Sequence, residues 1–263
     1  MQCFTLSNGV KIPVVGSGTN SFAKTDGVFN GSTKEVISAI EAGYTFFDTA
    51  ESYRNEEAVG DGIIESGVGR ENIFVATKMA TRSEKPLGRN DAVAAIERSL
   101  NKLKTDYIDL YLIHFPWEKR DEEKEVWETF EEYYRKGVLK AIGVCNHMPD
   151  DLEFLIKNCE IKPMVNQVKC NPDEWNKAAV DFSQANGIIP IAWGPLKFAA
   201  EHRPPIEEIG RKYGKTWAQT ILRYHFQRGV ISIPKSHSFE HQKENLDIFD
   251  FELTPDEMRI IAG

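Results

Sequence analysis

Four polar residues stand at or just after short apolar runs, and their side chains suit acid–base chemistry at a carbonyl group. Asp48 ends the run TFFD, and Tyr53 follows five residues later. Lys78 follows IFVAT, and His114 follows IDLYLI. A phenol with an ordinary pKa of about 10 becomes a better proton donor when a nearby ammonium group stabilises the phenolate. A carboxylate would keep that ammonium charged, and an imidazole would orient and polarise a carbonyl oxygen.

Each of the four residues also has an ordinary structural explanation. Asp48 could cap a turn, and Tyr53 could pack through its ring. Lys78 could be a surface cation, and His114 could hydrogen-bond a backbone group. Taken singly, these explanations are the better ones. Together, at the ends of three successive apolar runs, the four residues are better explained by a carbonyl-reducing site.

The elements that would position these residues are predicted by alternating apolar runs and amphipathic segments. Within residues 91–103, for example, apolar residues recur at helical spacing. Eight strands separated by helices, in a chain of 263 residues, predict an α/β fold, a (β/α)8 TIM barrel; a doubly wound sheet is the alternative. The dipeptide Asn8-Gly9 predicts an N-terminal β-hairpin ahead of the barrel. The eight predicted strands are residues 13–15, 45–48, 73–77, 108–113, 139–144, 164–168, 188–192 and 230–233.

Composition narrows the function classes. With 32 Lys and Arg against 40 Asp and Glu, the formal charge is −8, which disfavours nucleic-acid and anionic-membrane partners. The four cysteines contain no CxxC pair, so we expect a reducing, cytoplasmic location and neither disulfides nor a metal site. No leader or membrane-spanning run is evident. Because no linker or change of composition divides residues 1–263, we expect a single domain. The acidic balance favours a small-molecule substrate, and we expect a monomer or weak dimer.

Three motifs are rejected. The segment GSGTNS at 16–21 has Ser21 where a dinucleotide fingerprint has its third glycine. The segment GRKYGKT at 210–216 is one residue too short for a phosphate-binding loop and follows a helical pattern. His237 and His241 have the spacing of a helical metal pair but no evident third ligand, so a surface position is the better interpretation.

The order and spacing of several motifs resemble the aldo-keto reductase family, of the small bacterial type. They are GYTFFDTAESYRNEEAVGDGI, IFVATK, DLYLIHFP, KAIGVCN, NQV and VISIPKS. The resemblance extends from the hairpin to FELTPDEM. It implies an NAD(P)H-dependent reductase of aldehydes or ketones that binds NADP(H) on the barrel without a Rossmann domain. Asp48, Tyr53, Lys78 and His114 match the family's catalytic positions, with Tyr53 as the proton donor.

The resemblance also implies the residues that contact the cofactor. Asn146 and Gln167 would hold the nicotinamide carboxamide, and Trp193 would stack on its ring. The segment after the last strand would hold the 2′-phosphate of the adenosine. The expected cofactor contacts are Cys145, Asn146, Gln167, Trp193, Gly194, Leu196, Lys235, Ser236, His241, Glu244 and Asn245.

This sequence departs from the family pattern at several of these positions. Cys145 replaces a serine, Trp193 replaces a tyrosine, and His241 stands where the family has an arginine that grips the 2′-phosphate. Because histidine is largely neutral at pH 7 and lacks the guanidinium fork, we expect a softened preference for NADP(H) and some use of NAD(H).

The substrate pocket is expected to be open and polar. Asn20 replaces an aromatic residue that usually faces the pocket, and the chain ends at Gly263, before the loop that commonly covers it. Phe115 and Trp117 are the expected apolar wall. Two other functions are alternatives. They are a Schiff-base aldolase with Lys78 as its nucleophile and a regulatory protein that binds nucleotide without turnover.

Overall fold

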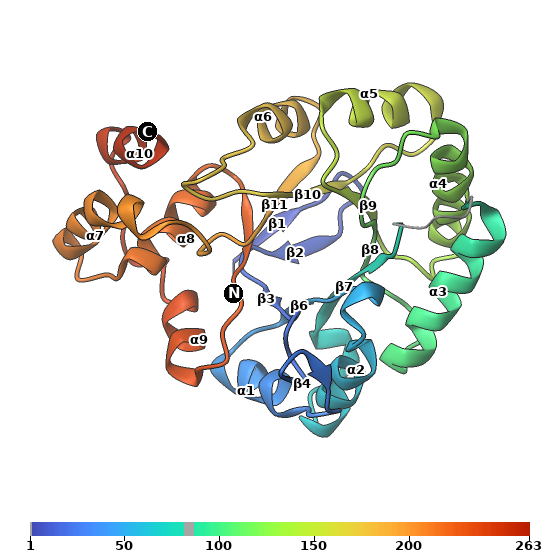
Figure 1. Cartoon of the computed structure of the whole chain (residues 1–263), viewed down its shortest axis with the longest axis horizontal. Coiled ribbons are helices and arrows are strands. Elements are labelled where there is room, and N and C mark those ends of the chain that lie inside the picture. The colour runs from blue at the N-terminus through green and yellow to red at the C-terminus, as the bar shows by residue number, and fades with distance from the viewer. Residues whose placement is uncertain (1, 82–86) are drawn as a thin grey trace.

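The computed structural model describes residues 2–81 and 87–263, and these form a parallel sheet curved into a barrel (Figure 1). Each strand pairs in parallel with the next one along the chain. Val15 pairs in parallel with Ser232, and the Gly18 amide donates to the Pro234 carbonyl at 3.0 Å, which joins the two outer strands. The predicted TIM barrel is therefore confirmed. Its strands are β3 (Ser17–Gly18), β6 (Phe46–Asp48), β7 (Phe74–Met79), β8 (Leu110–Ile113), β9 (Ile142–Cys145), β10 (Val165–Lys169), β11 (Ile189–Trp193) and β12 (Ile231–Ile233).

The helices form a ring outside the barrel (Figure 1). In α3, the residues Ala92, Ala95, Ile96 and Leu103 are buried, as the helical spacing of apolar residues predicts. The described α-helices are α1 (Lys34–Ala42), α2 (Glu56–Glu65), α3 (Arg89–Leu103), α4 (Arg120–Arg135), α5 (Pro149–Asn158), α6 (Lys177–Ala185), α7 (Arg203–Lys212), α8 (Trp217–Gln227), α9 (Phe239–Leu246) and α10 (Pro255–Ala262). Short 3-10 helices are η1 (Glu51–Tyr53), η2 (Arg70–Asn72) and η3 (Ala200–His202).

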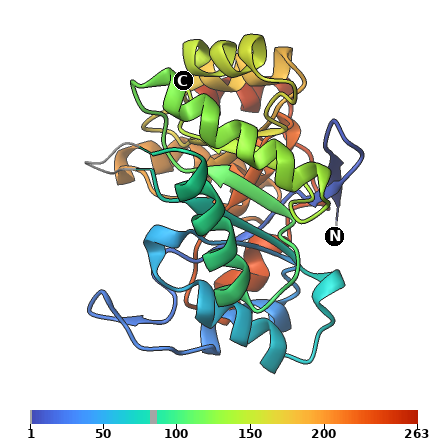
Figure 2. The same ribbon diagram turned by 90° about the vertical axis from the view of Figure 1, so that its right-hand side faces the viewer.

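Two hairpins lie outside the barrel. The predicted one pairs β1 (Cys3–Thr5) with β2 (Lys11–Pro13), and Gly9 adopts φ +90° in its turn. The second pairs β4 (Lys24–Thr25) with β5 (Val28–Phe29) and was not predicted from the sequence. Figure 2 shows the two hairpins at opposite ends of the barrel. The N-terminal hairpin is therefore remote from the barrel end that carries the second one.

The first barrel strand lies later than predicted. The predicted position of this strand, residues 13–15, is wrong, because Pro13 ends the hairpin strand β2 and β3 begins at Ser17. The segment that enters the barrel contains Gly16, where a Cβ atom would overlap the ring of Phe46. This close approach explains why the strand carries so little apolar sequence signal.

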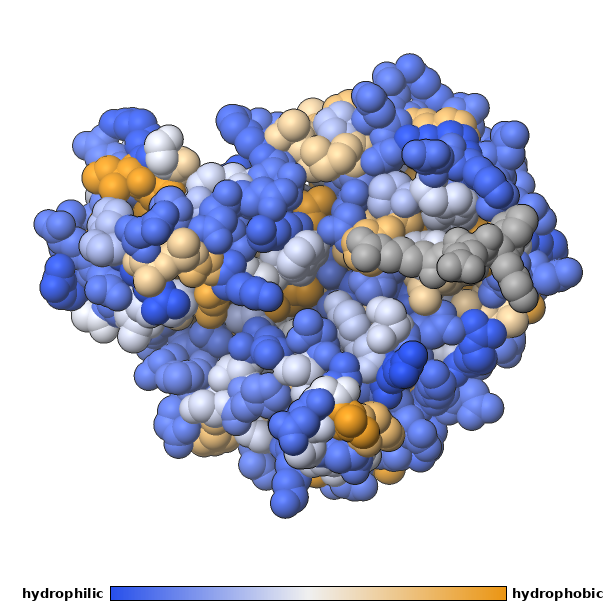
Figure 3. All heavy atoms as spheres, viewed as in Figure 1, coloured by the Kyte–Doolittle hydropathy of each residue, from blue (hydrophilic) through white to orange (hydrophobic). Residues whose placement is uncertain are grey.

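The face that contains the carboxyl ends of the strands is mainly hydrophilic, with a hollow near its centre (Figure 3). Exposed apolar side chains include Val28 and Phe29 on the second hairpin. Of the helices in the described ranges, none has the length and apolar content that a bilayer crossing requires.

Candidate active site

A cavity of about 640 Å³ opens at the carboxyl ends of the strands. This is the barrel end at which TIM-barrel enzymes place their chemistry. Its lining comes from the ends of β3, β6, β8, β9, β10, β11 and β12 and from the segments that follow them. The described lining residues are Gly18, Thr19, Asn20, Asp48, Tyr53, His114, Phe115, Cys145, Asn146, Gln167, Trp193, Gly194, Pro195, Leu196, Lys197, Phe198, Arg203, Ile233, Pro234 and Lys235.

A buried ion pair adjoins the cavity, and one of its members, Asp48, lines it. The Lys78 ammonium donates to Asp48 Oδ1 at 2.6 Å and to the Thr49 carbonyl at 2.8 Å, and both charged side chains are almost inaccessible to solvent. The second carboxylate oxygen, Asp48 Oδ2, accepts from Gln167 Nε2 at 2.7 Å. β6 and β7 pair in parallel with Asp48 opposite Ala76, so Lys78, two residues after Ala76, lies near Asp48 on the same side of the sheet.

The pair keeps Lys78 charged. Burial is the largest single effect and acts to lower the pKa of Lys78, but the charge and hydrogen bond of Asp48, together with the smaller effects of Tyr53 and Cys145, outweigh it, and the net pKa lies above the ordinary value. An ammonium group has no lone pair and cannot attack a carbonyl carbon. The geometry therefore disfavours the Schiff-base aldolase considered from the sequence.

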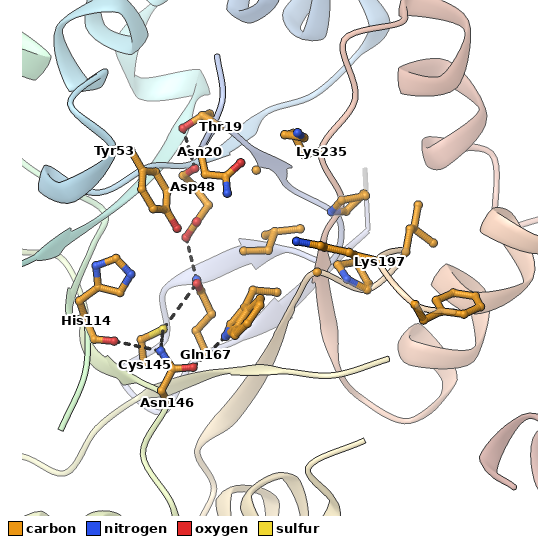
Figure 4. A pocket seen from close by; sticks show the side chains of 18 of the residues that line it. Thr19, Asn20, Asp48, Tyr53, His114, Cys145, Asn146, Gln167, Lys197 and Lys235 are labelled. Carbon is orange, nitrogen blue, oxygen red and sulfur yellow. Dashed lines mark hydrogen bonds between the residues drawn. The ribbon is translucent and has the colours of Figure 1, made fainter. Parts of the chain in front are cut away.

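Tyr53 lies at the end of η1, which follows β6, and its phenol points toward Asp48 (Figure 4). The Lys78 ammonium is 5.0 Å from the centre of the Tyr53 ring. Burial raises the pKa of Tyr53, while the positive charge of Lys78 acts in the opposite direction. The phenol is consequently protonated at neutral pH, and a cation is in place to stabilise the phenolate.

His114 follows β8 and is only 8% exposed. Its ring centre lies 5.8 Å from that of Tyr53, edge to face, and 4.7 Å from that of Phe115, nearly parallel. The Ser52 hydroxyl lies 3.3 Å from His114 Nδ1. Tyr53 and His114 therefore line the same part of the cavity, where a carbonyl oxygen could meet both.

The side-chain amides of Asn146 and Gln167 come from the end of β9 and from β10. Asn146 Oδ1 accepts from Trp193 Nε1 at 2.8 Å, and Asn146 Nδ2 donates to the His114 carbonyl at 3.1 Å. Cys145 Sγ lies 3.7 Å from Gln167 Oε1, and burial raises the pKa of its thiol to about 12. Together the amides offer donors and acceptors beside the indole of Trp193, which a carboxamide on a flat ring would require.

Cations line another part of the cavity. Figure 4 shows Lys197 and Lys235 farther from His114 than the two amides are. The Arg203 guanidinium lies 4.3 Å from the centre of the Trp217 ring, and its buried Nε has no hydrogen-bond partner among residues 2–81 and 87–263. Lys235 Nζ donates to Ser21 Oγ at 2.8 Å. The cations suit anionic groups, so the whole cavity fits a ligand that carries an amide on a flat ring together with phosphates.

The sequence was compared with models of known protein families. The model of the Aldo/keto reductase family matches residues 14–263. The chain belongs to this family. This match confirms the resemblance seen in the sequence. Aldo/keto reductases are oxidoreductases of carbonyl compounds.

Individual aldo/keto reductases resemble the chain over almost its whole length. Glyoxal reductase of Bacillus subtilis is 43% identical over 96% of this chain and 89% of that protein. The crystal structure of an aldo/keto reductase from Brucella melitensis has a TM-score of 0.91 at 37% identity, covering 99% of this chain and 98% of that one. The crystal structure of a Bombyx mori aldo-keto reductase in complex with NADP has a TM-score of 0.88 at 35% identity, covering 99% of this chain and 91% of that one.

Most of the site residues expected for an aldo/keto reductase line the cavity, and Lys78 is paired with Asp48, which lines it. Five others do not line it. Trp117 packs against the main core, and His241 and Glu244 are exposed on α9. Asn245 is buried and hydrogen-bonded to the Tyr44 phenol, which is an ordinary structural role. The fifth is Ser236, whose hydroxyl accepts from the Ser238 amide at 3.1 Å.

The sequence reasoning missed two of the cavity's cations, Lys197 and Arg203. Both lie in the segment that follows β11, and both line the cavity. Their proximity to Trp193 along the chain, just after a strand end, was the available signal.

Proposed function

We propose that this aldo/keto reductase reduces an aldehyde or ketone with NADPH, with Tyr53 as the proton donor. The observation that carries the proposal is the convergence of Tyr53, His114 and the buried Lys78–Asp48 pair at one cavity. In this reaction the nicotinamide of the bound cofactor supplies the hydride.

The side chains have separate tasks. His114 and Tyr53 hold the substrate oxygen and polarise its carbonyl bond, so that negative charge accumulates on that oxygen. Tyr53 then gives its phenolic proton to the oxygen, and the fixed charge of Lys78 stabilises the phenolate that remains. Asp48 keeps Lys78 charged and oriented throughout.

Other residues of the cavity would hold the cofactor. Asn146 and Gln167 would bind the carboxamide, with Cys145 beside them and Trp193 against the ring. Gly194 and Leu196 would lie along the cofactor. Lys197, Arg203 and Lys235 would pair with its phosphates, and Ser236, His241, Glu244 and Asn245 stay predicted contacts of the adenosine end.

Arg203 provides a test of the phosphate side. We expect Arg203→Met to weaken NADPH and NADH about equally, by roughly ten-fold, because both carry the diphosphate. The loss should shrink as salt rises. Titrations monitored by tryptophan fluorescence at two salt concentrations measure it. Unchanged affinity for both cofactors would remove Arg203 from the site.

His241 provides a test of cofactor choice. His241→Arg adds a permanent charge and a fork that can make two hydrogen bonds to the 2′-phosphate. We expect NADPH to bind about ten-fold more tightly, while NADH, which lacks that phosphate, is unaffected. Parallel titrations of both cofactors check this. Equal changes for the two would show that position 241 does not face the phosphate.

The substrate class is best approached through small dicarbonyl compounds, since glyoxal reductase is among the relatives. Asn20 and Phe115 line the cavity and would contact the substrate, whereas Trp117 would act at most through the packing around them. NADPH and NADH oxidation should be followed against glyoxal, other dicarbonyls, simple aldehydes and keto sugars. Oxidation with aldehydes supports the proposal, and NADPH binding without turnover of any of them would favour the regulatory alternative.

We also propose that residues 1–263 act as one catalytic domain, as a monomer or weak dimer in the cytoplasm. The family match over 14–263 supports a single catalytic unit. Sedimentation at several protein concentrations would test the association state.

A further inference from the structure

A buried histidine lies behind the two amides of the cavity. His147 is fully buried just after β9, and the Glu123 side chain that faces it from α4 is fully buried too. His147 Nε2 is 2.9 Å from Glu123 Oε1, and His147 Nδ1 is 3.0 Å from the Cys145 carbonyl oxygen. Each ring nitrogen therefore faces an oxygen at hydrogen-bonding distance.

These contacts limit where the protons of the His147 ring can lie. A carbonyl oxygen and a carboxylate oxygen only accept, so both imidazole nitrogens must donate. A neutral imidazole beside an ionised carboxylate has one proton too few, and one of the two contacts would become repulsive. Arg120 donates to the other side-chain oxygen of Glu123 at 2.9 Å. An imidazolium facing a carboxylate satisfies both contacts.

The pair belongs to a wider set of charges. Arg120 also pairs with Asp151, whose other carboxylate oxygen accepts from the Met148 amide at 2.8 Å at the start of α5. The charged groups in this network are thus Glu123 and Arg120 from α4 and Asp151 from α5. They tie two helices to the turn that ends β9.

That turn carries Asn146. The backbone of Asn146 is left-handed, with φ +61°, a conformation that asparagine adopts more readily than most residues other than glycine. His147 fixes the carbonyl on one side of Asn146, and the His147 carbonyl accepts from Asn166 Nδ2 at 2.9 Å on the other. The Asn146 side chain then reaches Trp193.

We propose that His147 is a positioning residue for the reaction: as an imidazolium clamped between Glu123 and the Cys145 carbonyl, it sets Asn146 and Trp193 for the nicotinamide. The inference rests on the proposed function for the cofactor role of Asn146. His147 lies outside the cavity lining, so it would act on cofactor binding through Asn146 and would not contact the cofactor or the substrate itself.

The proton count is tested without cofactor. Long-range ¹H–¹⁵N NMR spectra of the histidine rings at neutral pH should show His147 with both nitrogens protonated. His225 is a matched internal reference, because burial lowers its pKa to about 3 and keeps it neutral. A neutral His147 in the wild-type protein would overturn the proposal.

Two variants test the positioning. His147→Phe removes both hydrogen bonds and should weaken NADPH and NADH alike by about ten-fold in fluorescence titrations, and should shift the side-chain amide signals of Asn146. Glu123→Gln can donate to His147 Nε2 while still accepting from Arg120, so it should switch His147 to the neutral Nδ1–H form and keep affinity within about two-fold of wild type. His225→Phe should leave affinity unchanged.

The outcomes separate the two proposals. A folded His147→Phe protein with wild-type affinity and unshifted Asn146 signals would overturn the positioning role. If that variant does not fold, the Glu123→Gln spectrum decides, and an unchanged His147 ring state there contradicts the clamp. Failure of the wild type to bind either cofactor would instead refute the proposed function, while the NMR result on His147 would stand.

Discussion

Replacing Tyr53 with phenylalanine should lower the turnover of an aldehyde by about 10²–10⁴-fold, because the change deletes the proton donor. Little volume is lost, so the cavity keeps its shape. NADPH affinity should stay close to that of the wild type. Initial rates of NADPH oxidation, together with fluorescence titration of NADPH, measure both effects.

Tyr107→Phe is the matched control for this prediction. Tyr107 is partly buried beside Arg70, outside the cavity lining, so its replacement should leave turnover unchanged. A Tyr53→Phe protein that keeps most of the wild-type rate would exclude Tyr53 as the donor. A large loss of NADPH affinity would assign Tyr53 to binding.

The second large effect is expected for Lys78→Met. Tyr53 would lose the cation that stabilises its phenolate, which should lower turnover by about 10²–10³-fold. Asp48 would keep a buried charge without its partner, and breaking such a pair can cost about 3–5 kcal/mol of folding stability. Initial rates and urea unfolding of the same preparation measure the two effects.

An exposed lysine provides the comparison. Lys140→Met should change neither turnover nor the free energy of unfolding appreciably. Adding Asp48→Asn to Lys78→Met should recover part of the lost stability without recovering turnover, because the unpaired charge is removed but the cation is still missing. A fully active and equally stable Lys78→Met protein would show that the two side chains are not coupled.

The barrel could be predicted because its strands are short apolar runs, and the parallel register then places the residues after them on one rim. Asp48, Lys78 and His114 were found in this way. The entry of the first strand was misplaced because Gly16 and Gly18 pack closely and carry no apolar pattern. The hairpin of β4 and β5 was missed, although Asp26-Gly27 is a recognised turn signal.

The cations of the cavity could be predicted only in part. Lys235 was expected from the family pattern after the last strand. Arg203 depends on how the chain after β11 folds back over the barrel, where its guanidinium meets Trp217 from the next helix. Such a contact joins residues of separate elements and leaves no periodic pattern in the sequence. His147 was missed for the same reason, because its partner Glu123 lies on another helix.

The central claim is that hydride passes from bound NADPH to a carbonyl carbon in this cavity. It is tested most directly with NADPH that carries deuterium at both C4 positions of the nicotinamide, incubated with the aldehyde that the protein turns over fastest. We expect the alcohol to carry one deuterium on the carbon that bore the carbonyl oxygen. The Tyr53→Phe protein should form at least about 10²-fold less of this alcohol in the same time. Alcohol without deuterium, or equal yields from the two proteins, would contradict the account.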